Sequence, residues 1–102
     1  MVNLSNRIAL VTGASKGIGA GIARHLAQCG AAVAVNYATS PAGADRVVAQ
    51  IKAAGGQAIP VGADVSKKAH VERMFAEVHA KLGRIDIVIN NAGRYLLGRW
   101  RA

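Results

Sequence analysis

The sequence predicts an α/β protein in which a parallel sheet is covered by helices on both faces. Three observations predict it: continuous apolar runs, segments of helical period between them, and glycine or proline at the borders. A continuous apolar run is typical of a strand buried on both faces, and alternation of strands with helices favours parallel pairing. With 102 residues, 52% of them hydrophobic and 18% charged, the chain fits one folded domain with a sizeable core.

The elements follow from these runs in chain order. Apolar runs predict strands over residues 8–11, 31–35, 58–61 and 85–89. Between them, apolar residues recur at helical spacing and predict three helices. The three stripes are Ile18, Ile22 and Leu26; Ala44, Val47, Val48 and Ile51; and Val71, Met74, Phe75, Val78 and Leu82. Ser40-Pro41 and Ser66 provide start signals for the second and third helices, and Gly30, Gly55-Gly56 and Gly83 provide stop signals.

Pro60 indicates the order of the strands. Proline has no N–H for a ladder and is tolerated at the edge of a sheet rather than in its middle. In the Rossmann-like order 3-2-1-4, the third strand is an edge strand. We therefore expect a three-layer Rossmann-like sheet in this order, truncated after the fourth strand. Its fourth strand would then be an apolar edge open to self-association.

A glycine-rich loop joins the first strand to the first helix: Thr12-Gly13-Ala14-Ser15-Lys16-Gly17-Ile18-Gly19. Glycines in such a place permit a sharp turn, close approach of the backbone to a diphosphate, and tight packing of helix on strand. The N–H groups at the helix start then bind phosphate oxygens. The loop predicts a dinucleotide site, and the alternative is an ordinary glycine-rich turn.

The spacing T-G-x-x-x-G-x-G in this loop resembles the classical short-chain dehydrogenases/reductases, especially members that are 3-oxoacyl-acyl-carrier-protein-reductase-like. Asp64-Val65 after the third strand and Asn90-Asn91-Ala92-Gly93 after the fourth are similar to two further motifs of that family, in the expected order. The resemblance extends to about Gly93, fewer than half of the positions of a full-length member. It implies an NADP-binding Rossmann half-domain over residues 1–93, followed by an irregular basic tail over residues 94–102.

The resemblance also implies roles for individual residues. The diphosphate and the adenosine ribose would be surrounded by Gly13, Ser15, Gly17, Ile18 and Gly19. Asp64 would accept a hydrogen bond from the adenine amino group while Val65 packs beside the ring. The floor beneath the ribose and the nicotinamide would be formed by Asn90, Ala92 and Gly93, with Asn91 supporting the strand end. The alternative for Asp64 is a solvated loop acid near Ser66.

The segment after the second strand predicts NADP rather than NAD. NAD-dependent enzymes place an acidic residue there, which bonds the ribose hydroxyls and would repel a 2′-phosphate. Here no acid is present, and the residues available are Asn36, Tyr37, Thr39 and Ser40. Lys16 in the glycine-rich loop supplies a positive charge, and the resemblance associates a basic residue at this position with NADP.

No catalytic residue is expected in this chain. The family's catalytic Ser, further Asn, Tyr and the Lys four residues after that Tyr all follow the Asn-Asn-Ala-Gly segment. Tyr37 is followed four residues later by Pro41, and Tyr95 by Arg99. Two functional classes therefore stay open. One is an oxidoreductase for carbonyl/alcohol hydride transfer, including reduction of 3-oxoacyl thioesters, whose sequence is cut or frame-shifted. The other is a non-catalytic module that binds a nucleotide or a partner.

Other partners are not expected. His25, His70 and His79 lie apart on the helical segments, without metal-ligand spacing to Cys29, so no metal site is predicted. The formal charge of +8 is mostly scattered and aromatic residues are few, which argues against nucleic acid. No signal peptide or membrane-spanning run is evident, so the expected location is cytoplasmic. The expected partner is a nicotinamide dinucleotide, with a carbonyl or alcohol substrate only in a full-length form.

Overall fold

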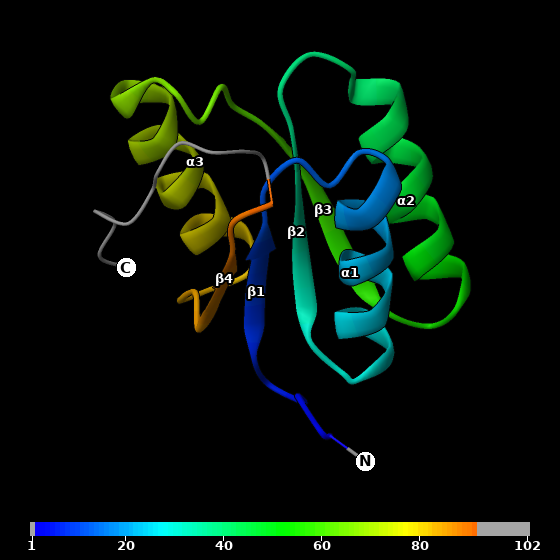
Figure 1. Cartoon of the computed structure of the whole chain (residues 1–102). Helices are drawn as coiled ribbons and strands as arrows, with labels where there is room; N and C mark the ends of the chain where they lie inside the picture. The colour runs from blue at the N-terminus through cyan, green and yellow to red at the C-terminus, as the bar shows by residue number, and fades with distance from the viewer. Residues whose placement is uncertain (1, 92–102) are drawn as a thin grey trace.

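The computed structural model describes residues 2–91 of the chain. Its elements alternate between strands and helices throughout this part (Figure 1). In chain order they are β1 (Ile8–Val11), α1 (Gly17–Gln28), β2 (Ala32–Tyr37), α2 (Pro41–Ala53), β3 (Gln57–Gly62), α3 (Lys68–Lys81) and β4 (Ile87–Ile89). The alternation predicted from the apolar runs is confirmed.

The strands form one parallel sheet in the order β3-β2-β1-β4. β1 is central and pairs with β2 on one side and with β4 on the other. Pro60 lies on the edge strand β3, opposite Val35 of β2. The edge position expected for this proline and the order 3-2-1-4 are both confirmed.

Two apolar cores lie on opposite faces of the sheet. On one face α1 and α2 cover buried residues such as Val11, Val33 and Val35. On the other face α3 packs Met74 and Val78 against residues that include Leu10 and Val61. Figure 1 shows the two layers, with α1 and α2 to the right of the sheet and α3 to its left. The expected three-layer arrangement is therefore present.

The buried face of α1 differs from the stripe of large residues that indicated the helix. Its fully buried residues are Gly19, Ala20 and Ala23, whereas Ile18 is 78% exposed. Ile22 and Leu26 are only partly buried at the border of the core. Small residues occupy the contact because α1 packs closely against the sheet and the glycine-rich loop, which leaves no room for a branched side chain.

Two predicted boundaries are also corrected. Helix α3 begins at Lys68 with Lys67 at its N-cap, not at Ser66. The Ser66 hydroxyl instead donates a hydrogen bond of 2.6 Å to Asp64 Oδ1. Strand β4 begins at Ile87 rather than at residue 85, because the Asp86 carboxylate bonds the N–H of Ile8 at 2.9 Å and Ile85 is buried against α3.

The carboxyl ends of the parallel strands meet at one edge of the sheet, drawn at the top of Figure 1. The loops that carry the predicted motifs leave the strands at this edge. Within residues 2–91, no helix is both long and apolar enough to cross a bilayer.

Candidate cofactor-binding site

A cavity of about 520 Å³ lies at the carboxyl edge of the sheet. The loops after β1, β2 and β3, the first turns of α2 and the end of β4 all contribute to its wall. The lining residues are Gly13, Ser15, Lys16, Asn36, Ala38, Thr39, Ser40, Ala42, Gly43, Arg46, Ala63, Asp64, Val65, Ser66 and Asn91. Its volume is in the range of small-molecule and cofactor sites.

The glycine-rich loop is held in a conformation that favours glycine. Gly13 and Gly17 have φ angles of 61° and 62°, in the left-handed region. A Cβ on Gly19 would lie 2.5 Å from Asn91 Nδ2 and closer still to the carbonyl oxygen of Gly13. The loop can therefore bring α1 onto the strand ends only with glycine at these positions.

The start of α1 presents unpaired donors beside the cavity. The first N–H groups of any α-helix have no acceptor within the helix. The N-cap residue, Lys16, makes no side-chain hydrogen bond to them. Together with the partial positive charge of a helix N-terminus, these N–H groups suit the oxygens of a phosphate.

Asn36 ties two walls of the cavity together. Its Oδ1 accepts a hydrogen bond from the N–H of Gly13 at 3.0 Å. Its Nδ2 donates to the carbonyl oxygens of Val61 and Ala63, each at 3.2 Å. Asn36 is 1% exposed, so this amide group is a buried support between the glycine-rich loop and the end of β3.

Asp64 lies in a tight turn after β3. Its Oδ1 accepts hydrogen bonds from the N–H of Ser66 at 2.9 Å and from the Ser66 hydroxyl at 2.6 Å. These two bonds hold the pKa of the Asp64 carboxyl below its ordinary value, and the positive charge of Lys67 acts in the same direction. Asp64 therefore presents a negatively charged acceptor to the cavity at neutral pH.

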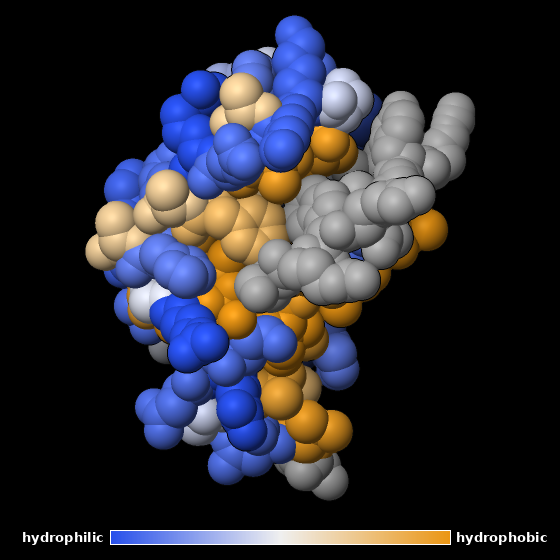
Figure 2. All heavy atoms as spheres, turned by 90° about the vertical axis from the view of Figure 1, so that its left-hand side faces the viewer, coloured by the Kyte–Doolittle hydropathy of each residue, from blue (hydrophilic) through white to orange (hydrophobic). Residues whose placement is uncertain are grey.

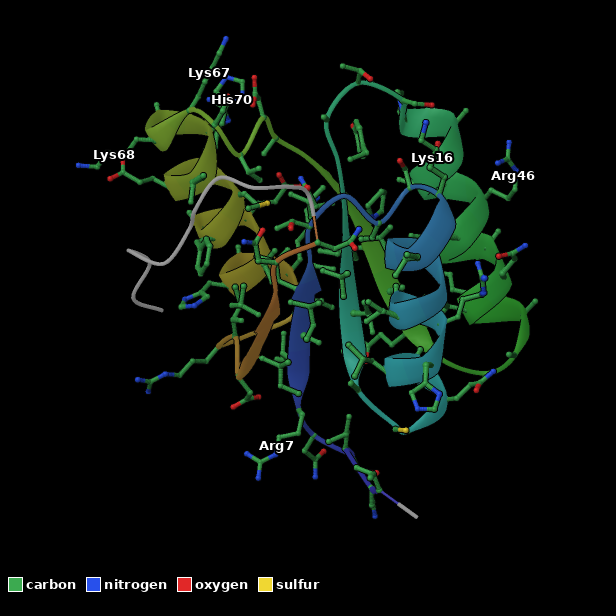
Figure 3. The ribbon with its side chains drawn as sticks, viewed as in Figure 1. Arg7, Lys16, Arg46, Lys67, Lys68 and His70 are labelled. Carbon is green, nitrogen blue, oxygen red and sulfur yellow. The ribbon has the colours of Figure 1, made fainter. Side chains whose placement is uncertain are left out.

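The opposite end of the cavity carries positive charge. Gly43 at the start of α2 approaches the glycine-rich loop so closely that a Cβ there would lie 2.7 Å from the Ser15 carbonyl oxygen. This contact brings Lys16 of the loop and Arg46 of α2 to the same cavity, and both side chains are exposed. Figure 3 shows Lys16 and Arg46 on the side of α1 and α2, and Lys67 and His70 on the side of α3.

Arg46 was not among the predicted site residues. Its signal in the sequence is its spacing from Ala42, four residues earlier in α2, because residues four apart lie on one face of a helix. Ala42 and Arg46 both line the cavity. The segment after β2 thus contributes Arg46 to the cavity, a cation that lies outside the sequence motifs of the family.

The end of β4 supports the glycine-rich loop. The N–H of Asn91 donates to Thr12 Oγ1 at 3.0 Å, and its Nδ2 donates to the Gly13 carbonyl oxygen at 3.2 Å. Asn90 places Oδ1 at 3.4 Å from Thr12 Oγ1. Asn91 thus has the supporting position that was expected for it.

The structure brings eight of the predicted site residues to the cavity wall: Gly13, Ser15, Lys16, Asn36, Thr39, Ser40, Asp64 and Val65. Five others lie near it without lining it: Gly17, Ile18, Gly19, Tyr37 and Asn90. The Tyr37 ring instead lies against Gly62 of β3, where a Cβ would come within 2.8 Å of it. Ala92 and Gly93, like Tyr95 and the predicted tail, lie outside the described residues.

The remaining candidate groups form no comparable site. Residues 2–91 contain no group of three or more His, Cys, Asp or Glu side chains placed to hold a metal ion. Cys29 Sγ lies 4.0 Å from His25 Nε2 at the end of α1, away from the cavity. Asp86 bonds the start of β1 and lies 3.9 Å from Arg7, so it connects β4 to the first strand.

The fold and this cavity define a dinucleotide-binding α/β protein, and comparison with known proteins identifies its family. Residues 7–100 match the short chain dehydrogenase family. The chain belongs to this family of oxidoreductases, whose members use a nicotinamide dinucleotide. The resemblance inferred from the glycine-rich loop, the Asp-Val pair and the Asn-Asn-Ala-Gly segment is thereby confirmed.

Curated relatives include an uncharacterized oxidoreductase of Methylorubrum extorquens, 54% identical over 93% of this chain and 38% of its own length. The 3-oxoacyl-acyl-carrier-protein reductase of Synechocystis sp. is 48% identical over 91% of this chain and 38% of its own length. Among solved structures, the angucycline C-6 ketoreductase LanV with bound NADP is 41% identical, with a TM-score of 0.81 over 90% of this chain and 38% of LanV. The chain therefore spans little more than a third of the length of these relatives.

Proposed function

We propose that the chain is the NADP-binding part of a short-chain dehydrogenase/reductase that transfers hydride between NADP(H) and a carbonyl or alcohol substrate, with 3-oxoacyl thioesters as a candidate substrate class. The observation that carries this proposal is the single cavity shared by the glycine-rich loop, the β2–α2 connection and the Asp64 turn. We assign the cofactor-binding unit to residues 1–93.

The two ends of the cavity support an orientation for the cofactor. The donors at the start of α1 suit the diphosphate, and the Asp64 carboxylate suits the adenine amino group. Asn36 contributes by holding the glycine-rich loop rather than through free donors, because its amide protons are already bonded to backbone carbonyls. Thr39 and Ser40 remain as neutral donors beside the adenosine ribose.

The positive charge of Lys16 and Arg46 favours NADP over NAD. Both residues line the cavity, and no residue that lines it between Asn36 and Arg46 is acidic. The only carboxylate in the lining set belongs to Asp64, on the loop after β3. A 2′-phosphate would therefore meet two cations, whereas a 2′-hydroxyl would forgo both contacts. The NADP bound to the similar ketoreductase LanV is consistent with this preference.

Isothermal calorimetry on the 102-residue chain tests the preference with NADP⁺, NAD⁺ and adenosine 2′,5′-bisphosphate. We expect NADP⁺ to bind more tightly than NAD⁺ and the bisphosphate to compete with it. Lys16→Ala should weaken NADP⁺ by roughly 1.5–3 kcal/mol, about 10- to 100-fold, and should hardly affect NAD⁺. Arg46→Ala should also weaken NADP⁺ more than NAD⁺, because it removes the second cation of the cavity wall.

Lys52→Ala is the matched control for Arg46, since Lys52 is an exposed cation in the last turn of the same helix and does not line the cavity. Its affinities should equal those of the unaltered chain. Equal affinity of the chain for NADP⁺ and NAD⁺ would overturn the assignment of the 2′-phosphate to Lys16 and Arg46. Absence of binding for both would overturn the cofactor site itself.

We expect the 102-residue chain alone to be inactive. A bound NADPH supplies the hydride, but the developing alkoxide also needs a positioned acid, which contributes about 10²–10⁴-fold in rate. No tyrosine in the sequence is followed four residues later by a lysine. The assay is loss of NADPH absorbance with a 3-oxoacyl thioester and simple ketones. Turnover that disappears in Tyr95→Phe would contradict this expectation and assign the acid to Tyr95.

A further inference from the structure

His70 lies behind the cavity rather than in its wall. It is in the first turn of α3 and is half-buried. Its Nδ1 accepts a hydrogen bond of 3.1 Å from the backbone N–H of Asp64, six residues earlier. The contact joins α3 to the turn that carries the proposed adenine acceptor, and Figure 3 shows His70 at this end of the helix.

Three polar groups of Asp64 are fixed by neighbours in this turn. Its N–H donates to His70, its carbonyl oxygen accepts from the N–H of Lys67 at 3.0 Å, and its Oδ1 accepts from Ser66. Among the described residues no donor bonds Oδ2. The network therefore fixes the backbone and one carboxylate oxygen of Asp64, and it leaves the second oxygen to accept a bond from a ligand.

Within residues 2–91, His70 is the one side chain of α3 that forms a hydrogen bond to this turn. The N-cap residue Lys67 makes no side-chain capping bond. An imidazole nitrogen accepts a hydrogen bond only when it carries no proton. Protonation of His70 on both nitrogens therefore removes the bond to Asp64.

The charged surroundings of His70 come from its own loop and helix. The Asp64 carboxylate and the Lys67 ammonium lie beside it, and Lys68 is exposed in the same first turn. The strands whose residues share a core with α3 are β1, β2, β3 and β4, and none of them carries a charged residue. Because the pKa of Asp64 is held below its ordinary value, Asp64 stays ionised at pH 5.5 and above. His70 is the group of this turn whose protonation state decides whether it can accept the Asp64 N–H.

We infer that His70 is a positioning residue that holds the Asp64 turn in its ligand-accepting conformation, so that dinucleotide affinity depends on the protonation of His70. The inference rests on the proposed function, because it takes the cavity as the dinucleotide site. No residue of α3 lines the cavity, so the role that this inference gives to α3 in cofactor binding is indirect.

Two substitutions separate the hydrogen bond from the charge. In His70→Asn, Oδ1 is as many bonds from Cα as Nδ1 of histidine, so the variant keeps the acceptor and loses the titration. His70→Ala removes both. His79→Asn is the matched control, since His79 is an exposed histidine in the last turn of the same helix.

Calorimetric affinity for NADP⁺ is measured at pH 8 and pH 5.5 for all four proteins. The 2′-phosphate itself titrates near pH 6, but this contribution cancels when each variant is compared with the unaltered chain at the same pH. At pH 8, His70→Asn should match the unaltered chain and His70→Ala should bind about 3- to 10-fold more weakly. At pH 5.5, the unaltered chain should bind NADP⁺ more weakly than His70→Asn by a similar factor. His79→Asn should bind it with the affinity of the unaltered chain.

A ligand-free readout keeps this inference distinct from the cofactor proposal. Amide hydrogen exchange at Asp64, compared at pH 8, should be slow in the unaltered chain and in His70→Asn and faster in His70→Ala. Equal exchange in all three, or equal NADP⁺ affinity of His70→Ala and His79→Asn, overturns the positioning role even where the cofactor binds. Unchanged ratios between His70→Asn and the unaltered chain at the two pH values overturn the dependence on protonation. Absence of NADP⁺ binding at pH 8 overturns the proposed function, and with it the affinity dependence, whatever the exchange data show.

Discussion

The Asn36 side chain connects two cavity walls, each of which lies more than twenty residues from it in sequence. Its carbonyl oxygen holds Gly13 and its amide nitrogen holds the end of β3. The sequence indicated a neutral residue at the end of the second strand, and from that a contact with the ribose was predicted. A place for Asn36 in the cofactor site stays a prediction, but its amide protons are bonded to backbone carbonyls and are not free for the ribose. The hydrogen bonds to the loops could not be anticipated, because sequence alone does not tell which backbone groups a buried amide will meet.

The Asp64–Ser66 pair predicts a pH dependence of stability. The pKa of Asp64 is lower in the folded chain than its ordinary value near 3.8, chiefly because of the two Ser66 hydrogen bonds. A carboxyl with a depressed pKa stabilises the fold above its unfolded pKa, and that contribution is lost as the pH falls through the folded pKa. Ser66→Ala should therefore raise the pKa of Asp64 and reduce the loss of stability between pH 7 and pH 3.

The measurement is a carbon-13 titration of the Asp64 carboxyl together with urea unfolding at both pH values. Ser5→Ala is a suitable control, because Ser5 is exposed. The backbone N–H of Ser5, not its hydroxyl, donates to the Asn3 side chain, so the substitution leaves that bond in place. If Asp64 titrates identically in Ser66→Ala and Ser5→Ala, the hydrogen bonds do not set its pKa.

At the scale of the element, α1 depends on glycine in one place and tolerates it in another. A Cβ at Gly19 would collide with the Gly13 carbonyl oxygen and with Asn91, whereas a Cβ at Gly21 would meet nothing within 4 Å. We expect Gly19→Ala to destabilise the fold by roughly 1–3 kcal/mol through forced displacement of the loop. Gly21→Ala should stabilise it by about 0.5–1 kcal/mol, because alanine loses less backbone entropy in a helix.

Urea midpoints of the two variants test this contrast directly, since both exchange glycine for alanine within one helix. NADP⁺ affinity should fall only in Gly19→Ala, whose loop must move. A Gly19→Ala protein with unchanged stability would show that the close contact between α1 and the loop is not required.

The helices differ in how well their buried faces could be predicted. In α2 the stripe of Ala44, Val47, Val48 and Ile51 is fully buried, as its spacing indicated. In α1 the spacing of Ile18, Ile22 and Leu26 located the helix but not its contact face. Periodicity reports which large residues share a face, but it does not report how closely two elements approach. Where the approach is close, small residues form the contact.

The start of α3 shows a competition between two local hydrogen bonds. A serine before a helix favours an N-cap, and on that basis Ser66 was expected to begin the helix. Serine and aspartate two residues apart also favour a turn in which they bond each other. The structure has the second arrangement, and the helix begins two residues later. Propensity alone does not decide between the two.

At the scale of the whole molecule, the sequence predicted that the motif loops lie close together, but it did not predict every side chain that lines the cavity between them. Loops after parallel strands gather at one edge by construction, so the glycine-rich loop and Asp64 had to lie close together. The contribution of Arg46 depends on where α2 begins relative to the loop, which is set by the contact of Gly43 with Ser15. Such a contact is a property of the packed structure.

The β4 side of the molecule predicts self-association. Within residues 2–91, β4 pairs only with β1, and each of its three residues is partly exposed. Figure 2 shows a band of hydrophobic surface on the side where β4 and α3 lie. An open apolar strand edge favours pairing with another chain. We expect the 102-residue chain to form dimers or larger species as its concentration rises.

Sedimentation velocity over a range of concentrations measures this association. Ile89→Lys, checked for folding by circular dichroism, should remain monomeric at concentrations where the unaltered chain assembles. Ile18→Lys is the control, because Ile18 is an exposed hydrophobic residue of α1 on another part of the surface. A chain that stays monomeric at every concentration would contradict the role of the β4 edge.

Pro60 makes the two edges of the sheet unequal in their ability to pair with a further strand. An incoming strand at the outer side of β3 would find no N–H donor at Pro60, so that rim resists extension. No such interruption occurs in the Ile-Val-Ile segment of β4. Among the described strands, β4 is therefore the edge without this interruption, and we expect an assembly built by strand addition to join two sheets β4 to β4, with both proline-bearing rims facing outward. Such an arrangement is closed by a twofold axis and cannot propagate into a fibre.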